Sequence, residues 1–371
     1  MENAKPILSV RDLNVKFSLR GRILHAIRGV SLDVMEGESL AIVGESGSGK
    51  SVLTKNFIGL LDPNGHISGG SIRYYGMKSL DTLRDSLHAT SEDGRAYADL
   101  ALIKKEKDWL KIRGSEVCMI PQDPMTSLNP LKSVGAQITE ALKLHSKLTG
   151  SAAREAAIHI LSDVRIDRPE QRYHQYPHEL SGGMRQRIVI AIAIACRPKV
   201  LICDEPTTAL DVTIQAQILN LLKEIKEKYH LTLVFITHDL GVVANIADRV
   251  AVMYAGDVVE LGLVNEIYYD PRHPYTWALL SSLPQLGQKG EKLFSIQGTP
   301  PNLFKQIPGD AFAQRNPTAL KIDHVQQPPY FQVSPTHIAR TWLMDERAPK
   351  VSPPDSILKL KMLGGVSRDA I

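Results

Sequence analysis

The fold of this chain is decided by Gly44-Glu45-Ser46-Gly47-Ser48-Gly49-Lys50-Ser51. This segment follows the short apolar run Ser39–Val43, which is typical of a buried strand. It precedes apolar residues that recur at helical spacing between Val52 and Leu61. The glycines therefore lie at a turn from a strand into a helix, where backbone N–H groups and the positive end of the helix converge on an anion. The segment predicts a loop that binds phosphate groups.

The side chains of this phosphate loop predict a nucleoside triphosphate with its metal ion. Lys50 can reach the β- and γ-phosphates, and the hydroxyl group of Ser51 can bind Mg²⁺. The glycines allow the backbone to bend tightly around the phosphates. The candidate nucleotide-binding residues of the loop are Gly44, Glu45, Ser46, Gly47, Ser48, Gly49, Lys50 and Ser51.

A second buried-strand pattern, Val200–Cys203, ends in the carboxylates Asp204 and Glu205. Ligands bind at the carboxyl ends of strands in parallel sheets. We expect Asp204 to bind Mg²⁺ together with Ser51, directly or through water. Glu205 lies one residue beyond this metal ligand, so it is expected to accept a proton from the attacking water.

Three further side chains are candidates for the same site. His238 follows an apolar strand pattern and is expected to bond the γ-phosphate and to help position the water and Glu205. Gln122 can reach the metal ion or the water through its amide, and it would report nucleotide occupancy to the helical region that follows. Phe17 either stacks on adenine or is an ordinary core aromatic residue, and the sequence leaves both readings open.

A second anion-binding helix start is predicted at Leu180-Ser181-Gly182-Gly183-Met184-Arg185-Gln186, called the signature segment below. One nucleotide does not need two such cradles from the same chain. We therefore expect Ser181, Gly182 and Gly183 to contact the γ-phosphate bound by another subunit. Two chains facing head to tail would then trap two nucleotides between them.

Strands and helices alternate after Gly37, which predicts an α/β fold with a parallel sheet. The first domain is expected to span residues 1–265. It would contain an inserted helical subdomain at about 125–185 and a polar, solvated insertion at about 78–113. Residues 266–371 are rich in proline, so they are expected to form a separate, loop-rich C-terminal extension.

Composition excludes several classes of protein. The chain has 371 residues, of which 43% are hydrophobic and 23% charged, and a net charge of only +4, too little to argue for a nucleic-acid partner. The longest strongly apolar stretch, Ile188–Cys196, is far shorter than the roughly 20 residues that cross a bilayer. Cys118, Cys196 and Cys203 lie in apolar surroundings without metal-binding spacing, so we expect small core residues.

Taken in order along the chain, these segments resemble the ATP-binding-cassette (ABC) ATPases. The resemblance rests on the phosphate loop, Gln122, the signature segment, the strand ending at Glu205, the turn at 209–211 and His238. It implies the ABC type of P-loop NTPase fold, with a RecA-like parallel-sheet core, an antiparallel β subdomain and an inserted helical subdomain. It also implies ATP and Mg²⁺ as cofactors, a role for Asp211 in the nucleotide site, and a dimer that closes on ATP and reopens on hydrolysis.

A narrower resemblance covers nearly the whole chain. Residues 122–130, 205–217, 273–276 and 298–301 are similar to the ATP-binding subunits of oligopeptide and dipeptide importers. The resemblance implies two transmembrane permease subunits, a second related ATPase in a heterodimer and an extracellular peptide-binding protein as partners, with no nucleic acid. It also implies a peripheral protein at the cytoplasmic face of the cell membrane.

The chain departs from this family in its extension. Many relatives have cysteines there that resemble iron–sulfur ligands, whereas this sequence has Asp310 and Asn316 at the corresponding places. No cysteine follows Cys203, so no iron–sulfur cluster is expected.

Two other functions compete with peptide import. A soluble cassette ATPase acting on DNA, RNA or ribosomes usually has two cassettes or a long coiled coil, and the sequence shows neither. An exporter ATPase would share the same ATP motifs, because these motifs do not encode direction. Only the resemblance of the extension favours import.

Overall fold

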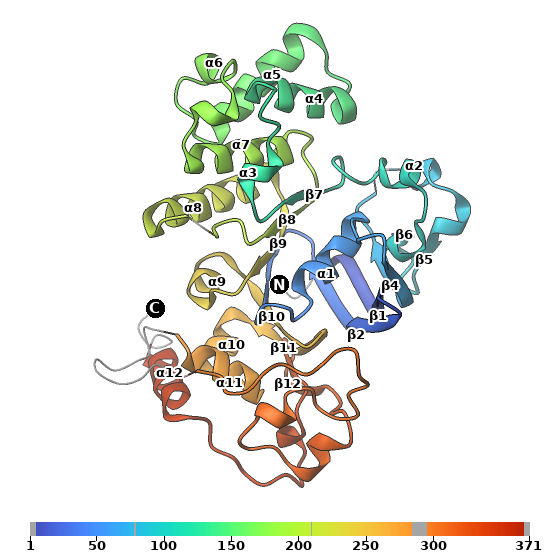
Figure 1. Ribbon diagram of the computed structural model, residues 1–371, viewed down its shortest axis with the longest axis vertical. Helices are drawn as coiled ribbons and strands as arrows, with labels where there is room; N and C mark the ends of the chain where they lie inside the picture. Colours follow the sequence, from blue (N-terminus) through green and yellow to red (C-terminus); the bar gives the residue numbers. More distant parts are fainter. Residues whose placement is uncertain (1–4, 78, 209, 284–294, 367–371) are drawn as a thin grey trace.

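The computed structural model describes residues 5–77, 79–208, 210–283 and 295–366. Positions 78 and 209, which belong to the expected insertion and to the expected turn, lie outside the described residues. The described chain contains an eight-stranded sheet and a five-stranded antiparallel sheet (Figure 1). Helices pack around the larger sheet, and the smaller sheet lies to one side of it.

The larger sheet has the strand order β12-β13-β11-β10-β3-β9-β8-β7. Its parallel part consists of β10 (Arg249–Tyr254), β3 (Ser39–Val43), β9 (Thr232–Thr237), β8 (Val200–Asp204) and β7 (Val117–Ile120). The predicted strand before the phosphate loop is thus confirmed. The strand that ends before His238 pairs with the strand that ends at the two carboxylates, so these polar groups share one edge of the sheet.

Alternate residues of the parallel strands face two hydrophobic layers. Ile202 packs in the layer between the two sheets, which also contains Leu53 of helix α1 (Lys50–Lys55). Cys203 and Phe235 point to the opposite face and pack against the helical subdomain and α8 (Val212–Tyr229). Cys118 and Cys203 are buried core residues as predicted, whereas Cys196 is only half-buried at the edge of this second layer.

Helices gather in the region 125–185, as the sequence predicts, and form the upper part of the molecule in Figure 1. They are α3 (Pro124–Ser127), α4 (Val134–Ser146), α5 (Gly150–Asp163), α6 (Pro169–Arg172), η5 (Pro177–Glu179) and the start of α7 (Gly182–Ile194). Helix α9 (Leu240–Ile246) follows β9 and packs beside α8. Within the described ranges, no helix has the length and apolar character that crossing a bilayer requires.

The helix after the phosphate loop is shorter than its apolar spacing predicts. Helix α1 spans only Lys50–Lys55 and continues as the 3₁₀ turn η1 (Asn56–Ile58). Gly59 then takes a left-handed conformation with φ +62°. A Cβ atom on Gly59 would lie 2.2 Å from the ring of Trp109, so the close approach of this tryptophan also requires glycine there.

Residues 78–113 are only partly solvated, because several of their apolar residues are buried. The segment supplies two strands to the antiparallel sheet, whose order is β2-β1-β4-β6-β5. Its members are β1 (Pro6–Leu19), β2 (Arg22–Met35), β4 (Gly65–Tyr74), β5 (His88–Thr90) and β6 (Ala96–Asp99). The short helices η2 (Leu80–Thr82), η3 (Asp85–Leu87), η4 (Leu100–Leu102) and α2 (Glu106–Trp109) surround them. Leu87, Leu100 and Trp109 join the hydrophobic core, while Lys104 and Lys105 are exposed. The many charged residues of the segment therefore mask its buried face in the sequence.

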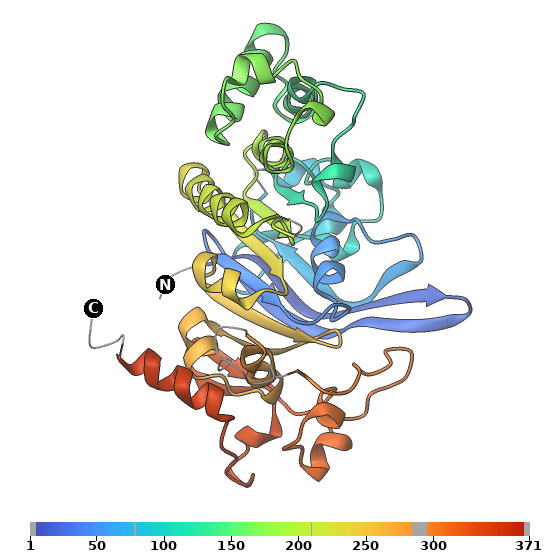
Figure 2. The same ribbon diagram turned by 60° about the vertical axis from the view of Figure 1, so that its left-hand side comes forward.

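The C-terminal extension is rich in loops, as expected, and two of its strands continue the larger sheet. Strand β11 (Asp257–Leu263) pairs with β13 (His337–Ala339), which pairs with β12 (Phe331–Ser334). Figure 2 shows the extension packed below the strands. It also contains α10 (Val264–Tyr269), α11 (Pro274–Ser281), α12 (Asp355–Val366) and the short helices η7 (Ala313–Arg315), η8 (Lys321–His324) and η9 (Trp342–Met344).

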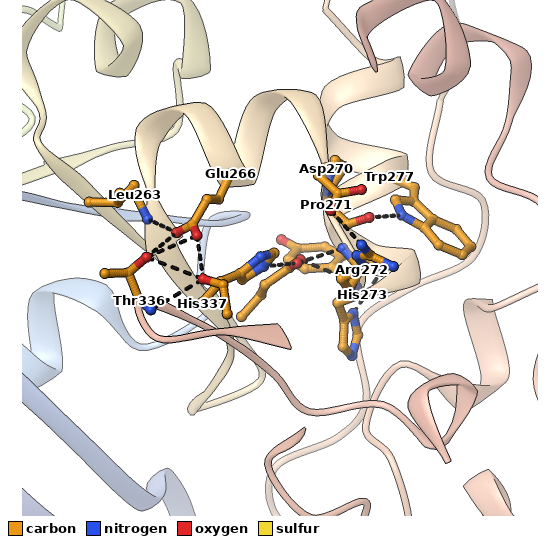
Figure 3. Close-up of polar contacts among 12 residues, drawn as sticks. Leu263, Glu266, Asp270, Pro271, Arg272, His273, Trp277, Thr336 and His337 are labelled. Carbon is orange, nitrogen blue, oxygen red and sulfur yellow. Dashed lines mark hydrogen bonds and ion pairs between the residues drawn. The ribbon is translucent and has the colours of Figure 1, made fainter. Parts of the chain in front are cut away.

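Buried polar contacts hold this junction together. Glu260 on β11 is fully buried and accepts a hydrogen bond from the backbone N–H of His273 at 3.1 Å. Nε2 of the buried His337 lies 2.8 Å from the other oxygen of the same carboxylate. Beside them, the hydroxyl of Thr336 donates to Glu266 at 2.9 Å (Figure 3). Removing one partner of such a network would leave a buried charge without compensation.

Asp310 and Asn316 are both buried, and each uses its side chain to stabilise a turn. Oδ1 of Asp310 accepts from the N–H of Phe312 at 2.9 Å, and Oδ1 of Asn316 accepts from the N–H of Thr318 at 2.9 Å. Burial raises the pKa of Asp310 from 3.8 to about 6. A carboxyl group whose pKa is raised by folding contributes most stability below its unfolded pKa and loses that contribution as the pH rises through its folded pKa.

We therefore predict that Asp310→Asn stabilises the protein progressively as the pH rises from 4 to 7. At pH 7 the gain should be on the order of 2–3 kcal/mol, because one pKa unit corresponds to about 1.4 kcal/mol. Urea unfolding at several pH values measures it, with the exposed Glu92→Gln as the control. A pH-independent difference between variant and wild type would contradict the assignment.

Candidate functional site

The phosphate loop joins β3 to α1, as the sequence predicts. Gly44, Gly47 and Gly49 have φ values of +150°, +78° and +102°, which L-residues with side chains rarely adopt. A Cβ atom on Gly44 would also lie 2.1 Å from the carbonyl oxygen of Met253 on the neighbouring strand. The shape of the loop therefore depends on glycine at these positions.

Lys50, the first residue of α1, is buried, with a relative exposure of 6%. Its Nζ donates to the carbonyl oxygens of Gly44 at 2.7 Å and Glu45 at 2.9 Å, so the ammonium group lies inside the loop. Burial lowers the pKa of Lys50, and the nearby carboxylates of Glu205 and Asp204 oppose this shift. A positive charge held within a ring of backbone groups is suited to bind phosphate oxygens.

Ser51 and Asp204 fit a site for Mg²⁺. The hydroxyl of Ser51 donates to Oδ1 of Asp204 at 3.0 Å, and Asp204 is only 6% exposed. Hydroxyl and carboxylate oxygens are ligands that Mg²⁺ prefers. Burial raises the pKa of Asp204, and a nearby cation would favour its ionised form. Gln122, the third predicted metal ligand, donates through its Nε2 to Glu205 at 3.0 Å.

The carboxylate of Glu205 is held by three side chains from three segments. Gln122 and Thr208 each donate to Oε2 at 3.0 Å, and Nδ1 of His238 lies 3.2 Å from Oε1. The backbone of Glu205 has a φ of +46°, a strained conformation that is common at functional sites. Burial alone would raise the pKa of Glu205, but the bonds from His238 and Thr208 outweigh it and keep the pKa below its ordinary value. Glu205 is therefore ionised at neutral pH and able to accept a proton.

A cavity of about 470 Å³ adjoins the phosphate loop. Its lining includes these predicted residues: Phe17, Ser46, Gly47, Gly49, Lys50, Ser51, Gln122 and Glu205. Phe17 is only 7% exposed and belongs to the core, yet it also forms part of the wall. Phe17 is thus both a core residue and part of the cavity wall. Contact with adenine stays a prediction.

Sequence reasoning missed Leu303, which lines the same cavity from the extension. Its carbonyl oxygen accepts from the N–H of His25 on β2 at 3.0 Å. No local pattern marks this residue, because the contact depends on how the extension folds back. Thr208 was also missed, although it lies three residues after Glu205 in the segment that resembles the importers.

Glu45 and Ser48 do not line this cavity. The carboxylate of Glu45 points to the extension and pairs with Arg315, with 2.6 Å between Oε2 and Nη1. Ser48 is buried, and its carbonyl oxygen accepts from the N–H of Gly256 at 2.8 Å. The carboxylate of Glu45 and the backbone of Ser48 therefore hold the loop through contacts outside the cavity.

The signature segment lies away from this cavity. Helix α7 begins at Gly182 as predicted, and Ser181 caps it by accepting from the N–H of Met184 at 3.3 Å. None of Ser181, Gly182 and Gly183 lines the cavity beside the phosphate loop of the same chain. Asp211 caps α8, accepting from the N–H of Ile214 at 2.9 Å. The contacts of these residues with a nucleotide stay a prediction.

Comparison with known proteins identifies the family. Residues 27–208 match the model of the ABC transporter family, and residues 259–322 match the oligopeptide/dipeptide transporter C-terminal region. The oligopeptide transport ATP-binding protein AmiE of Streptococcus pneumoniae is 56% identical over 354 residues, covering 95% of this chain and 94% of that protein. This chain belongs to the family of ABC-type peptide transport ATP-binding proteins. The oligopeptide transport ATP-binding protein OppD of Bacillus subtilis is 52% identical over 358 residues, covering 96% and 94% of the two chains.

Solved structures confirm the fold class. The ATP-binding cassette MJ0796, a dimer bound to ADP and Pi, has a TM-score of 0.56 at 24% identity, covering 69% of this chain and 98% of that one. The cbiO1 protein of Clostridium perfringens, part of an ABC transporter complex, has a TM-score of 0.57 at 28% identity, covering 71% and 91%. The predicted P-loop fold of the ABC type, with its second sheet and inserted helices, is thus confirmed for this ABC ATPase.

We predict that Lys50→Ala weakens ATP binding at least about tenfold, because it removes charge-assisted hydrogen bonds to the phosphates. Equilibrium titration of the full chain with ATP measures the dissociation constant. The control is Lys104→Ala, which removes an exposed lysine outside the phosphate loop. This variant should leave the dissociation constant for ATP unchanged. An unaltered dissociation constant for Lys50→Ala would exclude the loop as the phosphate site.

Proposed function

We propose that this chain is the ATP-hydrolysing subunit of a membrane importer for oligopeptides or dipeptides. The observation that carries the proposal is the carboxylate of Glu205, oriented by Gln122, Thr208 and His238 at the mouth of the phosphate loop. Such an arrangement serves hydrolysis rather than binding alone. The names of the relatives, which are oligopeptide and dipeptide transport ATP-binding proteins, support peptide as the cargo.

The hydrolytic step follows from the geometry of the site. The loop amides and Lys50 hold the phosphates of ATP, and Ser51 with Asp204 would hold Mg²⁺, which neutralises phosphate charge when bound. Glu205 accepts a proton from the water that attacks the γ-phosphorus, while the bond from that phosphorus to the bridging oxygen breaks and ADP leaves. His238 and Gln122 keep the carboxylate aimed at that water, so both act by orientation.

The complete site requires two subunits. Ser181, Gly182 and Gly183 do not line the cavity of their own chain. We infer that they close over the γ-phosphate of a facing ATPase, with Asp211 at the same interface. ATP then favours the closed pair, and loss of the γ-phosphate removes that preference. By similarity to the importer subunits, the facing chain is a second, related ATPase in a heterodimer.

A second cavity suits a permease contact. It has a volume of about 330 Å³ and lies where β7 meets the helical subdomain. Met119, Pro121, Leu128 and Val189 are among its apolar lining residues, and Gln122 follows directly in the chain. An apolar segment of a transmembrane permease docked there would sense the position of Gln122. Two such permeases and an extracellular peptide-binding protein complete the proposed transporter, with this chain as a peripheral subunit at the cytoplasmic face of the membrane.

The test is peptide uptake by vesicles that contain the assembled transporter. Labelled peptide should accumulate only with ATP, and peptide should stimulate hydrolysis. A complex whose hydrolysis does not respond to peptide, and which accumulates none, would overturn the proposed cargo.

In the same vesicles, Glu205→Gln should retain ATP binding but lose hydrolysis and uptake by about 100-fold or more, the usual contribution of a general base. Glu227→Gln, an exposed position on α8, is the matched control. A Glu205→Gln complex that hydrolyses ATP at the wild-type rate would remove Glu205 from the mechanism.

A further inference from the structure

Arg315 lies at the end of η7 in the C-terminal extension. Each nitrogen of its guanidinium group has a polar partner. Its side chain is 4% exposed. Nη1 and Nη2 donate to the two carboxylate oxygens of Glu45 at 2.6 and 2.9 Å, which is a bidentate pair. Nη1 also contacts the hydroxyl of Tyr254 at 3.1 Å, and Nε donates to the carbonyl oxygen of Gln297 at 2.9 Å. The guanidinium group is therefore fixed in one orientation.

Glu45 is the second residue of the phosphate loop, and it is held at three points. Its carboxylate binds Arg315, and its backbone N–H donates to the hydroxyl of Tyr275 on α11 at 2.8 Å. Its carbonyl oxygen accepts from Nζ of Lys50 at 2.9 Å. A shift of Glu45 would consequently move the ammonium group that the site uses for phosphate.

An aromatic cluster supports these contacts. The rings of Tyr254 and Tyr275 have centroids 4.5 Å apart, and the ring of Phe312 packs 5.3 Å from each of them. The guanidinium of Arg315 lies 5.8 Å from the ring of Tyr254 and 5.9 Å from the ring of Phe312. Buried, closely packed rings restrict the motion of the arginine, so the extension presents a rigid partner to the loop.

We propose that Arg315 is a positioning residue of the nucleotide site, through which the C-terminal extension holds the phosphate loop in its ATP-binding shape. The inference rests on the proposed ATP site. Leu303, also in the extension, lines the cavity beside the phosphate loop, and Phe17 lines that cavity as well. The extension is thereby part of the ATP-binding structure, and changes in it alter the affinity for ATP.

Two conservative variants test this pair. Arg315→Lys keeps the positive charge but loses the bidentate geometry, and Glu45→Gln keeps the shape but loses the negative charge. Each should raise the dissociation constant of the full chain for ATP about tenfold, the effect of losing a charge-assisted hydrogen bond. The double variant should be no worse than either single variant, because both disrupt one interaction. In the assembled transporter the KM for ATP should rise while kcat at saturating ATP changes little.

Arg340→Lys is the matched control. Arg340 is another arginine that ties the extension to the sheet, and its Nη1 donates to Asp257 at 2.6 Å rather than to a residue of the phosphate loop. The variant should lower the melting temperature without changing the affinity for ATP. The proposal is overturned if Arg315→Lys leaves ATP affinity at the wild-type value, if both arginine variants weaken it equally, or if the effects of Glu45→Gln and Arg315→Lys add. A wild-type chain that binds no ATP would instead overturn the proposed function, and this inference with it.

Discussion

The nucleotide site depends on a loop whose backbone shape only glycine permits. At Gly44 the φ is positive, and a Cβ atom would lie 2.1 Å from the carbonyl oxygen of Met253, so every other residue is excluded. Lys50 lies inside this loop, where its Nζ donates to the carbonyl oxygens of Gly44 and Glu45. Strand β3 leads into the loop and pairs with its neighbour β10. The parallel sheet therefore holds the loop in place.

Two carboxylates connect this loop to the rest of the molecule. The carboxylate of Glu205 contacts Gln122, Thr208 and His238. Gln122 precedes the helical subdomain, whereas Thr208 and His238 follow the ends of two strands. Glu45 connects the loop to the extension through Arg315. The carboxylate proposed for nucleotide chemistry therefore contacts the start of the proposed permease contact through Gln122, and the extension contacts the phosphate loop through Arg315. A change in the bound phosphate can reach both ends of the molecule through these side chains.

Local sequence patterns predict the parts of the site in which chemistry and short-range geometry coincide. The phosphate loop, the pair Ser51 and Asp204, and the strand that ends before His238 follow from such patterns and agree with the structure. The buried face of residues 78–113 was not predicted, because isolated apolar residues among many charges do not show that they share one face. Arg315 and Leu303 could not be predicted either, since their contacts join segments more than 250 positions apart without a local motif.

The central claim is that each ATP is enclosed by the phosphate loop of one subunit and the signature segment of the other. The most direct test places Ser181→Arg in the assembled transporter and measures retention of a photoreactive ATP analogue on each ATPase subunit separately. The account predicts that this chain keeps its own label while the facing subunit loses retention. The exposed Ser146→Arg is the control and should change neither. Loss of label on this chain, with the facing subunit unaffected, would contradict the shared site.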